Sequence, residues 1–402
     1  GCVLKFFWFF LFTKRTVLSC CQRIGKSRER EKKGYLYGTM RYCIALSLVP
    51  GVGSKHMRRL LAAFGSAEEV MGAGVDRLMA AGVSLRMSQE IAGGATVARA
   101  MSVIDLCRST GVRVLTVGMA EFPRAFAECP DAPCVLYVRG GIDFNAGKWI
   151  SVVGTRNATQ NGVSVTGRVV RDIAMLYPET VIVSGLAFGI DKAAHSAALQ
   201  YRVRTVAVMA GWVDDIVPRT HYYLARQILD AGGAIVSDMP PGTVIDRGNF
   251  LSRNRLVAGL SEATIVVESA ARGGSLVTAD IAVSYNKELF ALPGAISEPM
   301  SEGTNMLIRS NKAIMYQSAE DVALALGWER SSPAAGAVDG RLEQLSPRLR
   351  QAYEAIPDGV RLDAEGLADL WEVRIWEASS LVGQLRAKGL LAADPYKCYY
   401  KI

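Results

Sequence analysis

The segment Trp149-Ile-Ser-Val-Val-Gly154-Thr-Arg156 decides the fold, because a short apolar run passes through a glycine toward a predicted helix. It is one of four junctions between Ile150 and Thr278 at which the turn or helix start suits a phosphate group. The other three read Ser184-Gly-Leu-Ala-Phe-Gly-Ile-Asp191, Asn249-Phe-Leu-Ser-Arg-Asn-Arg255 and Arg272-Gly-Gly-Ser-Leu-Val-Thr278. Small residues at such junctions leave backbone N–H groups open to an anion. Several anion sites along one sheet edge predict a ligand with many phosphates, such as a nucleic acid strand.

Short apolar runs of strand length alternate with helical patterns from Val112 onward. The predicted strands are Val112–Val117, Val135–Val138, Trp149–Val153, Thr180–Ser184, Thr205–Met209, Ala234–Ser237, Thr264–Glu268, Glu288–Ala291 and Ala313–Tyr316. The predicted helices include Gly162–Leu176, Ile190–Gln200, Tyr222–Ala231 and Ser275–Asn286. This alternation predicts an α/β fold with a doubly wound, mostly parallel sheet and helices on both faces. Ligands of such sheets bind beyond the carboxyl ends of the strands, where the four junctions lie.

The chain of 402 residues is long enough for two or three domains. Residues 1–39 form a leader whose place in the translated protein is doubtful. After it we expect a helical domain in 40–110, a Rossmann-like domain in 111–328, a linker in 329–342 and a winged-helix domain in 343–402. The last assignment follows from three helical patterns and a predicted hairpin with Asp394-Pro395 at its turn. The three helical patterns are Ser346–Ala355, Asp363–Leu370 and Trp376–Lys388.

Two helical patterns in the first domain are separated by Pro50-Gly-Val-Gly53, a spacing typical of a helix–hairpin–helix or SAM-like domain. The second pattern begins at Ser54, which is expected to cap it. The glycine turn of such a motif brings backbone N–H groups close to a phosphate. A plain corner between two helices needs glycine for a left-handed turn and explains the same residues. Both interpretations remain open at this stage.

Charge is concentrated in the leader. The chain carries a net charge of +8, and residues 1–39 hold nine Lys or Arg and two Glu, a charge of +7, which leaves +1 for the other 363 residues. A nucleic-acid interface must therefore use local clusters of cations. The apolar run Phe6–Phe12 is far shorter than the roughly 20 residues that span a bilayer. We expect translation to begin at Met40, a cytoplasmic protein and no membrane partner.

The sequence offers little material for a metal or a cofactor. Its eight cysteines are scattered, and Cys129 and Cys134 have no further Cys or His nearby in sequence to complete four ligands. Buried, reduced thiols are the simpler interpretation. The chain has three histidines, no Gly-x-Gly-x-x-Gly fingerprint and no Walker-type Gly-Lys-Ser/Thr. No cofactor and no metal are therefore expected.

Asp191 and His195 are separated by one helical turn, so the sequence permits a contact between them. Asp191 also lies in the first turn of the predicted helix, where a carboxylate balances the helix dipole. Backbone N–H groups around Gly185 and Gly189 suit an anion, or the two glycines permit close packing. No nucleophile is placed for activation, so we expect structural bracing ahead of catalysis.

Single-strand binders combine cations that follow the backbone with an aromatic ring on which a base can stack. Residues 249–255 offer this mixture in Phe250, Arg253 and Arg255, although Phe250 suits a buried core equally well. Gly273-Gly-Ser275 opens a predicted helix whose free N–H groups suit a phosphate. Arg156 can donate two hydrogen bonds to a phosphate. Arg219, in the loop after the strand at Thr205–Met209, could add a cation at the same edge.

Together these motifs resemble the DNA-processing protein A family, also called DprA or Smf. The family pattern runs Val-Gly-Ser-Arg, Ser-Gly-Leu-Ala-x-Gly-Ile-Asp-x-x-Ala-His, Asn-Phe-x-x-Arg-Asn-Arg-Ile-Ile-Ser-Gly-Leu-Ser, Ser-Gly-Ser-Leu-Ile-Thr-Ala and Val-Pro-Gly. Its counterparts here are Val153–Arg156, Ser184–His195, Asn249–Ser261, Gly273–Ala279 and Leu292–Gly294, in the same order. Three departures are Thr155 for Ser, Phe188 for a frequent Arg, and Leu251-Ser252 for a common Pro-Arg.

The resemblance implies an extended Rossmann-like domain that binds single-stranded DNA without sequence preference. It also implies a homodimer that protects incoming strands in natural transformation and helps load the RecA recombinase. The residues expected to bind DNA are Gly154, Thr155, Arg156, Gly185, Phe188, Gly189, Arg219, Asn249, Phe250, Arg253, Asn254, Arg255, Gly273, Gly274 and Ser275. No residue is assigned a catalytic role.

Two other functions remain open from the sequence. One is a Rossmann-like enzyme that acts on nucleotides or nucleosides through Asp191 and His195. The other is a protein that bends duplex DNA through its winged helix. The wing region is not very basic, with Arg386, Lys388, Lys397 and Lys401, so this function ranks last.

Overall fold

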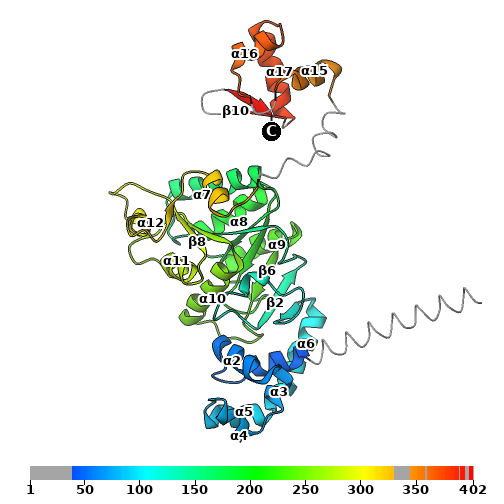
Figure 1. Ribbon diagram of the computed structural model, residues 1–402, viewed down its shortest axis with the longest axis vertical. Helices are drawn as coiled ribbons and strands as arrows, with labels where there is room; N and C mark the ends of the chain where they lie inside the picture. The colour runs from blue at the N-terminus through cyan, green and yellow to red at the C-terminus, as the bar shows by residue number, and fades with distance from the viewer. Residues whose placement is uncertain (1–38, 330–344, 358–359, 389, 394–397, 402) are drawn as a thin grey trace, which may run out of the picture. The chain divides into compact units, whose positions relative to one another are not determined.

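A computed structural model describes residues 39–329, 345–357, 360–388, 390–393 and 398–401 (Figure 1). The chain divides by its contacts into two compact units, with the boundary after Trp328. The predicted leader up to residue 38 and the predicted linker from residue 330 lie outside the described residues. The turn expected at Asp394-Pro395 lies outside them too.

The larger unit is built on a nine-stranded sheet with the order β1-β2-β6-β5-β4-β3-β7-β8-β9. Its strands are β1 Arg113–Thr116, β2 Val135–Gly140, β3 Lys148–Val153, β4 Thr180–Ser184, β5 Arg204–Val208, β6 Ala234–Ser237, β7 Ala263–Val266, β8 Glu288–Ala291 and β9 Ile314–Met315. From β6 to β9 all neighbouring strands are parallel, as expected. The sheet is mostly parallel, as predicted, and the exception is β2, which is antiparallel to both β1 and β6. Only a three-residue 3-10 turn, η1 Arg124–Phe126, lies between β1 and β2, and a parallel crossover needs a longer element.

Helices cover both faces of the sheet, as the alternating pattern predicts. One face packs against α10 Arg247–Leu260, α11 Gly274–Ser284 and α12 Glu302–Arg309. The opposite face packs against α7 Gln160–Leu176, α8 Ile190–Gln200 and α13 Ala319–Ala325. Within β4 the side chains alternate accordingly: Val181 and Val183 contribute to one core and Ile182 to the other. This is the doubly wound arrangement.

Strand β3 marks the point at which the chain reverses its direction across the sheet. After β3 the chain passes through α7 to β4 on one side, whereas β7 pairs with β3 on the other side. The connections that leave β3 and β7 therefore diverge at their carboxyl ends. Such a switch point leaves a crevice for a ligand.

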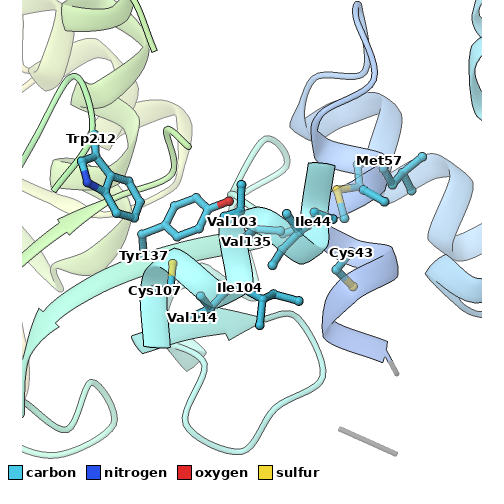
Figure 2. Packing of buried hydrophobic residues seen from close by; sticks show 14 of the residues in the cluster. Cys43, Ile44, Met57, Val103, Ile104, Cys107, Val114, Val135, Tyr137 and Trp212 are labelled. Carbon is cyan, nitrogen blue, oxygen red and sulfur yellow. The ribbon is translucent and has the colours of Figure 1, made fainter. Parts of the chain in front are cut away.

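The helical segment at the start of the described chain shares a hydrophobic core with this sheet. It consists of a helix over residues 39–47 and of α2 Ser54–Phe64, α3 Ala67–Met71, α4 Val75–Ala80, α5 Leu85–Ala92 and α6 Ala95–Thr110. Figure 2 shows Ile44 and Met57 in one cluster with Tyr137 of β2, whose ring meets Trp212 edge to face at 5.2 Å. Gly53 caps α2 instead of the expected Ser54, which is its first residue. The cores of the helices and of the sheet are therefore continuous.

The smaller unit contains α15 Pro347–Ala355, α16 Ala364–Leu370, α17 Ile375–Ala387 and the antiparallel strands β10 Leu391–Ala393 and β11 Tyr399–Lys401. Leu362 adds a bridge to Tyr399. Its core includes Leu349, Ile356 and Leu385. The order of three helices and a hairpin agrees with the predicted pattern, and the winged-helix assignment itself stays a prediction.

Ile44→Ala is expected to lower the free energy of unfolding by about 2–5 kcal/mol, the usual cost of truncating a fully buried isoleucine. Ile44 is completely buried in the core that joins the helices to β1 and β2. Chemical denaturation followed by tryptophan fluorescence measures the loss, since Trp212 belongs to the same core. The control Leu85→Ala removes a side chain that is 51% exposed and should change stability little. An unchanged Trp212 transition in Ile44→Ala would contradict a shared core.

Candidate nucleic-acid interface

A pocket of about 360 Å³ opens at the switch point, beyond the carboxyl ends of β3 and β4 and beside the start of α11. Of the residues expected to bind DNA, ten line it: Gly154, Thr155, Arg156, Gly185, Phe250, Arg253, Asn254, Gly273, Gly274 and Ser275. Five do not line it: Phe188, Gly189, Arg219, Asn249 and Arg255. The lining also includes Arg247 and Asp191, neither of which was expected there as a DNA contact.

The loop after β3 is held by Glu268, at the end of the neighbouring strand β7. The Thr155 N–H donates to the Glu268 carbonyl at 2.8 Å. The Glu268 carboxylate accepts from the Thr159 N–H at 3.0 Å and from the Thr159 hydroxyl at 2.5 Å. A Cβ on Gly154 would lie 2.5 Å from Ile190. Gly154 is therefore required by close packing, and Glu268 fixes the loop that carries Arg156.

Arg156 projects from this loop over the ring of Phe250, with its guanidinium carbon 5.2 Å from the ring centroid. This is cation–π distance. Arg156 is exposed, and within the described parts of the chain no carboxylate comes within ion-pair distance of it. Phe250 is half-buried, so it serves as a support for Arg156 as well as a lining residue. The guanidinium keeps its donors for a ligand.

The junction around Asn249, for which the sequence left a turn or a helix start open, is the first half of α10. The segment has many polar residues and so lacks the apolar pattern of a helix, but it is helical and begins with a capping box formed by Asp246 and Asn249. The helical period then places Arg247, Phe250 and Asn254 on the face that lines the pocket. Asn249 itself is occupied as a capping residue.

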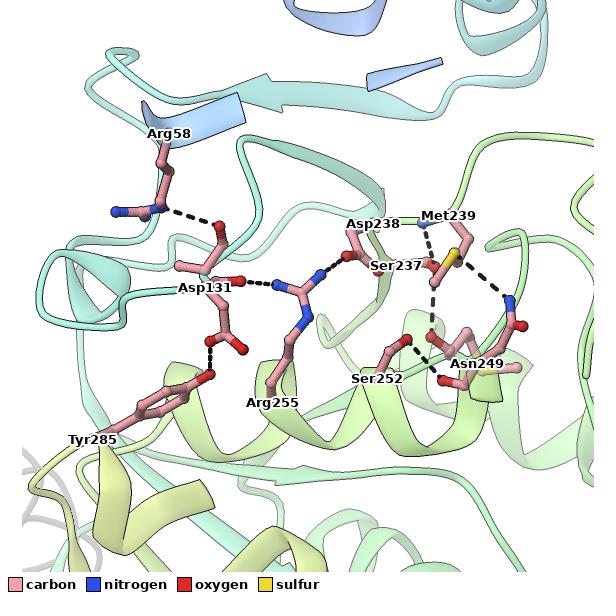
Figure 3. A network of polar contacts seen from close by, with 11 residues as sticks. Arg58, Asp131, Ser237, Asp238, Met239, Asn249, Ser252, Arg255 and Tyr285 are labelled. Carbon is pink, nitrogen blue, oxygen red and sulfur yellow. Dashed lines mark hydrogen bonds and ion pairs between the residues drawn. The ribbon is translucent and has the colours of Figure 1, made fainter. Parts of the chain in front are cut away.

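Arg255 lies on another face of α10 and is engaged elsewhere. It pairs with the carboxylate of Asp238 and donates to the carbonyl of Asp131, whose own carboxylate accepts from Tyr285 (Figure 3). Arg58 of α2 donates to the Ala132 carbonyl at 3.1 Å in the same network. The network joins α2 and α10 to the connection before β2. Within this fold Arg255 acts as a structural ion-pair partner.

Arg253 was expected to line the groove as a free cation, and the structure corrects this interpretation. Its side chain is 5% exposed, and Nη1 donates to the carbonyls of Gly185 at 2.6 Å and Val208 at 2.7 Å. Burial lowers the pKa of this guanidinium, while the charge of Asp191 raises it. A Cβ on Gly185 would lie 1.9 Å from Arg253 Nη1. Arg253 therefore forms the floor of the pocket and ties β4 and β5 to α10.

The backbone nest predicted between Ser184 and Asp191 already holds an anion, namely the Asp191 carboxylate. Its Oδ2 accepts from the N–H groups of Gly185 at 3.1 Å and Ala187 at 3.4 Å. Burial raises the pKa of this carboxyl, and the Arg253 guanidinium opposes the shift. Gly189 adopts φ +73°, and a Cβ there would lie 2.2 Å from the Thr155 carbonyl. The glycines of this junction serve packing, so the structural interpretation holds.

His195 does not form the suggested contact with Asp191. It is fully buried, and its Nδ1 lies 2.7 Å from the hydroxyl of Thr205 on β5. No hydrogen bond joins His195 to Asp191 among the contacts of the described residues. Burial lowers the pKa of His195 to about 3, so the imidazole is neutral near pH 7. The pair needed for the enzyme alternative is therefore not formed.

The start of α11 offers the open anion site in the pocket. Its N-cap, Gly273, has no side chain to cap the helix. Ser275 donates its hydroxyl to Ser269 at 2.9 Å. At Gly274 a Cβ would meet no atom within 4 Å, so the space beside this first residue of the helix is empty. An uncapped helix start of this kind attracts anions.

Comparison with known proteins gives the family. The sequence profile described as DNA recombination-mediator protein A matches residues 113–327, more than half of the chain. The chain belongs to this family. It is 34% identical over 221 residues to DNA processing protein DprA of Bacillus subtilis, covering 55% of this chain and 73% of that protein. It is 33% identical over 291 residues to Protein Smf of Synechocystis, covering 71% and 72%.

A crystal structure of DNA processing protein A from Streptococcus pneumoniae matches this family member with a TM-score of 0.58 at 28% identity. The match covers 71% of this chain and 97% of the other. The Rossmann-like assignment is thereby confirmed. The resemblance to the DprA and Smf proteins, drawn from the motifs, is confirmed as well.

Two of the expected residues that lie outside the pocket, Phe188 and Arg219, lie on the connections that follow β4 and β5. Phe188, one of the departures from the family pattern, is half exposed and packs edge to face on His221 with centroids 4.9 Å apart. Arg219 lies two residues before His221, at the start of η2 Arg219–His221, and lines a separate pocket with Tyr222 and Asp215. Phe188 therefore lies on the connection after β4, and through His221 it contacts the connection after β5 that carries Arg219.

The described residues form neither a metal-ligand cluster nor a membrane-spanning helix. Among the described residues, no three His, Cys, Asp or Glu side chains gather as metal ligands. The described cysteines Cys43, Cys107, Cys129 and Cys134 are buried free thiols, whose pKa values burial raises. No helix in the described ranges has the length and apolarity required to cross a bilayer.

Arg253→Ala is expected to destabilise the protein by about 3 kcal/mol or more. It removes two charge-assisted hydrogen bonds, each worth about 1.5–3 kcal/mol, and leaves Asp191 without its nearby positive charge. Thermal unfolding measures the loss. The matched control is Arg247→Ala on the same helix, an exposed residue whose removal should change stability by less than about 0.5 kcal/mol. Equal stability of the two variants would show that Arg253 is not a structural residue.

Proposed function

We propose that the protein binds single-stranded DNA without sequence preference, with strand phosphates seated in the switch-point pocket. The observation that carries the proposal is the convergence of three features there. They are the exposed guanidinium of Arg156, the exposed guanidinium of Arg247 and the uncapped start of α11 at Gly274. All three attract a phosphate without reading a base.

Because the pocket has few exposed cations, we infer that it contacts only a short stretch of a single strand. Two arginines line the pocket as exposed side chains, while Arg253 is buried and Arg255 is paired within the protein. Each phosphate contact by a cation contributes about 0.7 to the salt dependence of single-strand binding. Affinity then comes from backbone N–H groups and helix polarity as much as from formal charge. In the same pocket the Asp191 carboxylate accepts from two backbone N–H groups and the Ser275 hydroxyl donates to Ser269, and we infer that the protein acts by binding.

Membership in the family extends this proposal to a cellular role. Relatives are DNA processing proteins, and the resemblance implies protection of incoming single strands during natural transformation and help in loading the RecA recombinase. We place this role in the cytoplasm and in a homodimer. Strands of arbitrary sequence must be accepted for such a role, which agrees with a pocket that addresses the sugar–phosphate backbone.

Arg156→Ala combined with Arg247→Ala is expected to weaken binding of an oligothymidylate and to reduce the slope of log K against log salt by about 1.4, or 0.7 for each lost contact. Fluorescence anisotropy over a salt series measures both quantities. Arg99→Ala, combined with Arg168→Ala, removes the same charge from exposed positions on α6 and α7 and serves as the control. An unchanged salt slope in the pocket variant would refute this pocket as the phosphate site.

Gly274→Asp is expected to abolish phosphate binding at the start of α11 while the fold stays intact. The new side chain enters empty space, and a carboxylate in the first turn stabilises a helix. It would also occupy the site with a negative charge. Gly274→Ala adds a Cβ without charge and should bind oligothymidylate nearly as well as the unaltered protein. If the Asp and Ala variants bound equally, the helix start would not be a phosphate site.

A further inference from the structure

Three large aromatic side chains are exposed in the segments that follow β4 and β5, one on the connection after β4 and two at the start of the helix after β5. Phe188 is 50% exposed, Tyr222 is 49% exposed and Tyr223 is 79% exposed. Tyr222 and Tyr223 are the first two residues of α9 Tyr222–Asp230, and their ring centroids are 5.9 Å apart. Exposed apolar side chains that gather in this way mark a binding surface.

The surface is continuous with the pocket through one short loop. Ala187 lines the pocket, and Phe188 is the next residue in the chain. The ring of Phe188 meets that of His221 at 4.9 Å, and His221 is followed directly by the two tyrosines. A strand that leaves the pocket past Ala187 therefore reaches these rings.

The rings are also held in fixed positions. His221 is buried, and its Nδ1–H donates to the carbonyl of Leu186 at 2.8 Å. This bond ties the start of α9 to the loop that carries Phe188. A preformed aromatic surface loses little conformational freedom when it binds a ligand.

The charges around the surface decide what it binds. Asp214 and Asp215 line the neighbouring pocket, and Asp214 is neutralised by Arg139, with atoms 2.5 Å apart. Asp215 forms no ion pair among the described residues, so a phosphate group is disfavoured beside it. Arg219, which lines the same pocket as Asp215, is an exposed cation. Uncharged base rings fit the aromatic side chains, and one phosphate fits Arg219.

We propose, on the premise that the pocket binds single-stranded DNA, that Phe188, Tyr222 and Tyr223 form a platform on which bases of the outgoing strand stack. Stacking on a ring tolerates every base and is worth about fivefold or more in affinity for each base. The platform thereby adds affinity that the nearly neutral body of the protein does not supply through charge. It adds no preference for a particular hydrogen-bonding edge.

The test compares an oligothymidylate with an oligonucleotide of equal length in which every base is replaced by an abasic spacer. The unaltered protein should bind the oligothymidylate more tightly. Phe188→Ala combined with Tyr223→Ala should weaken oligothymidylate binding at least about fivefold and leave abasic binding unchanged. Phe188→Tyr combined with Tyr223→Phe keeps both rings and should restore binding. Trp376→Ala, which removes a 68% exposed ring from the smaller unit, is the control.

Three results would overturn the platform. They are unchanged oligothymidylate binding by the alanine variant, equal losses on the two oligonucleotides, or no rescue by the variant that keeps the rings. Failure of the proposed function gives a different result, because the unaltered protein would then bind neither oligonucleotide. If the pocket binds DNA but the aromatic side chains do not stack on bases, Arg156→Ala combined with Arg247→Ala still weakens oligothymidylate binding.

Discussion

The arrangement of α8, α10 and β4 in the larger unit depends on Gly185, whose backbone is bonded to two buried side chains of opposite charge. Arg253 donates to its carbonyl, and Asp191 accepts from its N–H. Through these bonds α10, α8 and the end of β4 are fixed to one another. The two groups leave water together, so each offsets part of the desolvation cost of the other. The floor of the pocket is thus polar, yet its charges are already balanced.

This balance changes the meaning of the basic residues in the motif. A cation that is needed for the fold is not free to attract a ligand, even when it lines a cavity. Attraction is left to exposed groups such as Arg156 and to the partial charges of a helix start. Glu268 also has a structural role, since its carboxylate accepts two hydrogen bonds from Thr159 and holds the loop before α7. The site is a rigid polar frame with a small number of free donors.

The regular parts of the fold could be predicted from the sequence. The strands Thr180–Ser184, Ala234–Ser237 and Glu288–Ala291 match the predicted bounds, because apolar runs between turn residues have few other solutions. The helix Arg247–Leu260 was missed, since its first half is polar and carries no apolar stripe. That single omission misplaced Arg253 and Arg255, whose roles depend on which face of a helix they occupy. Burial of a charged side chain against distant carbonyls leaves no local signal in the sequence.

Because α10 turns by about 100° per residue, its two polar faces are separated by rotation alone. Arg247 and Asn254 belong to the pocket, whereas Arg255 belongs to the network around Asp131 and Asp238. One inserted residue near the middle of the helix would rotate every residue that follows it by about 100° away from its present face. The chain length between the capping box at Asp246 and the end of the helix is therefore constrained, whereas the length of the loop before Asp246 is not. Length variation among relatives should accordingly gather ahead of the cap.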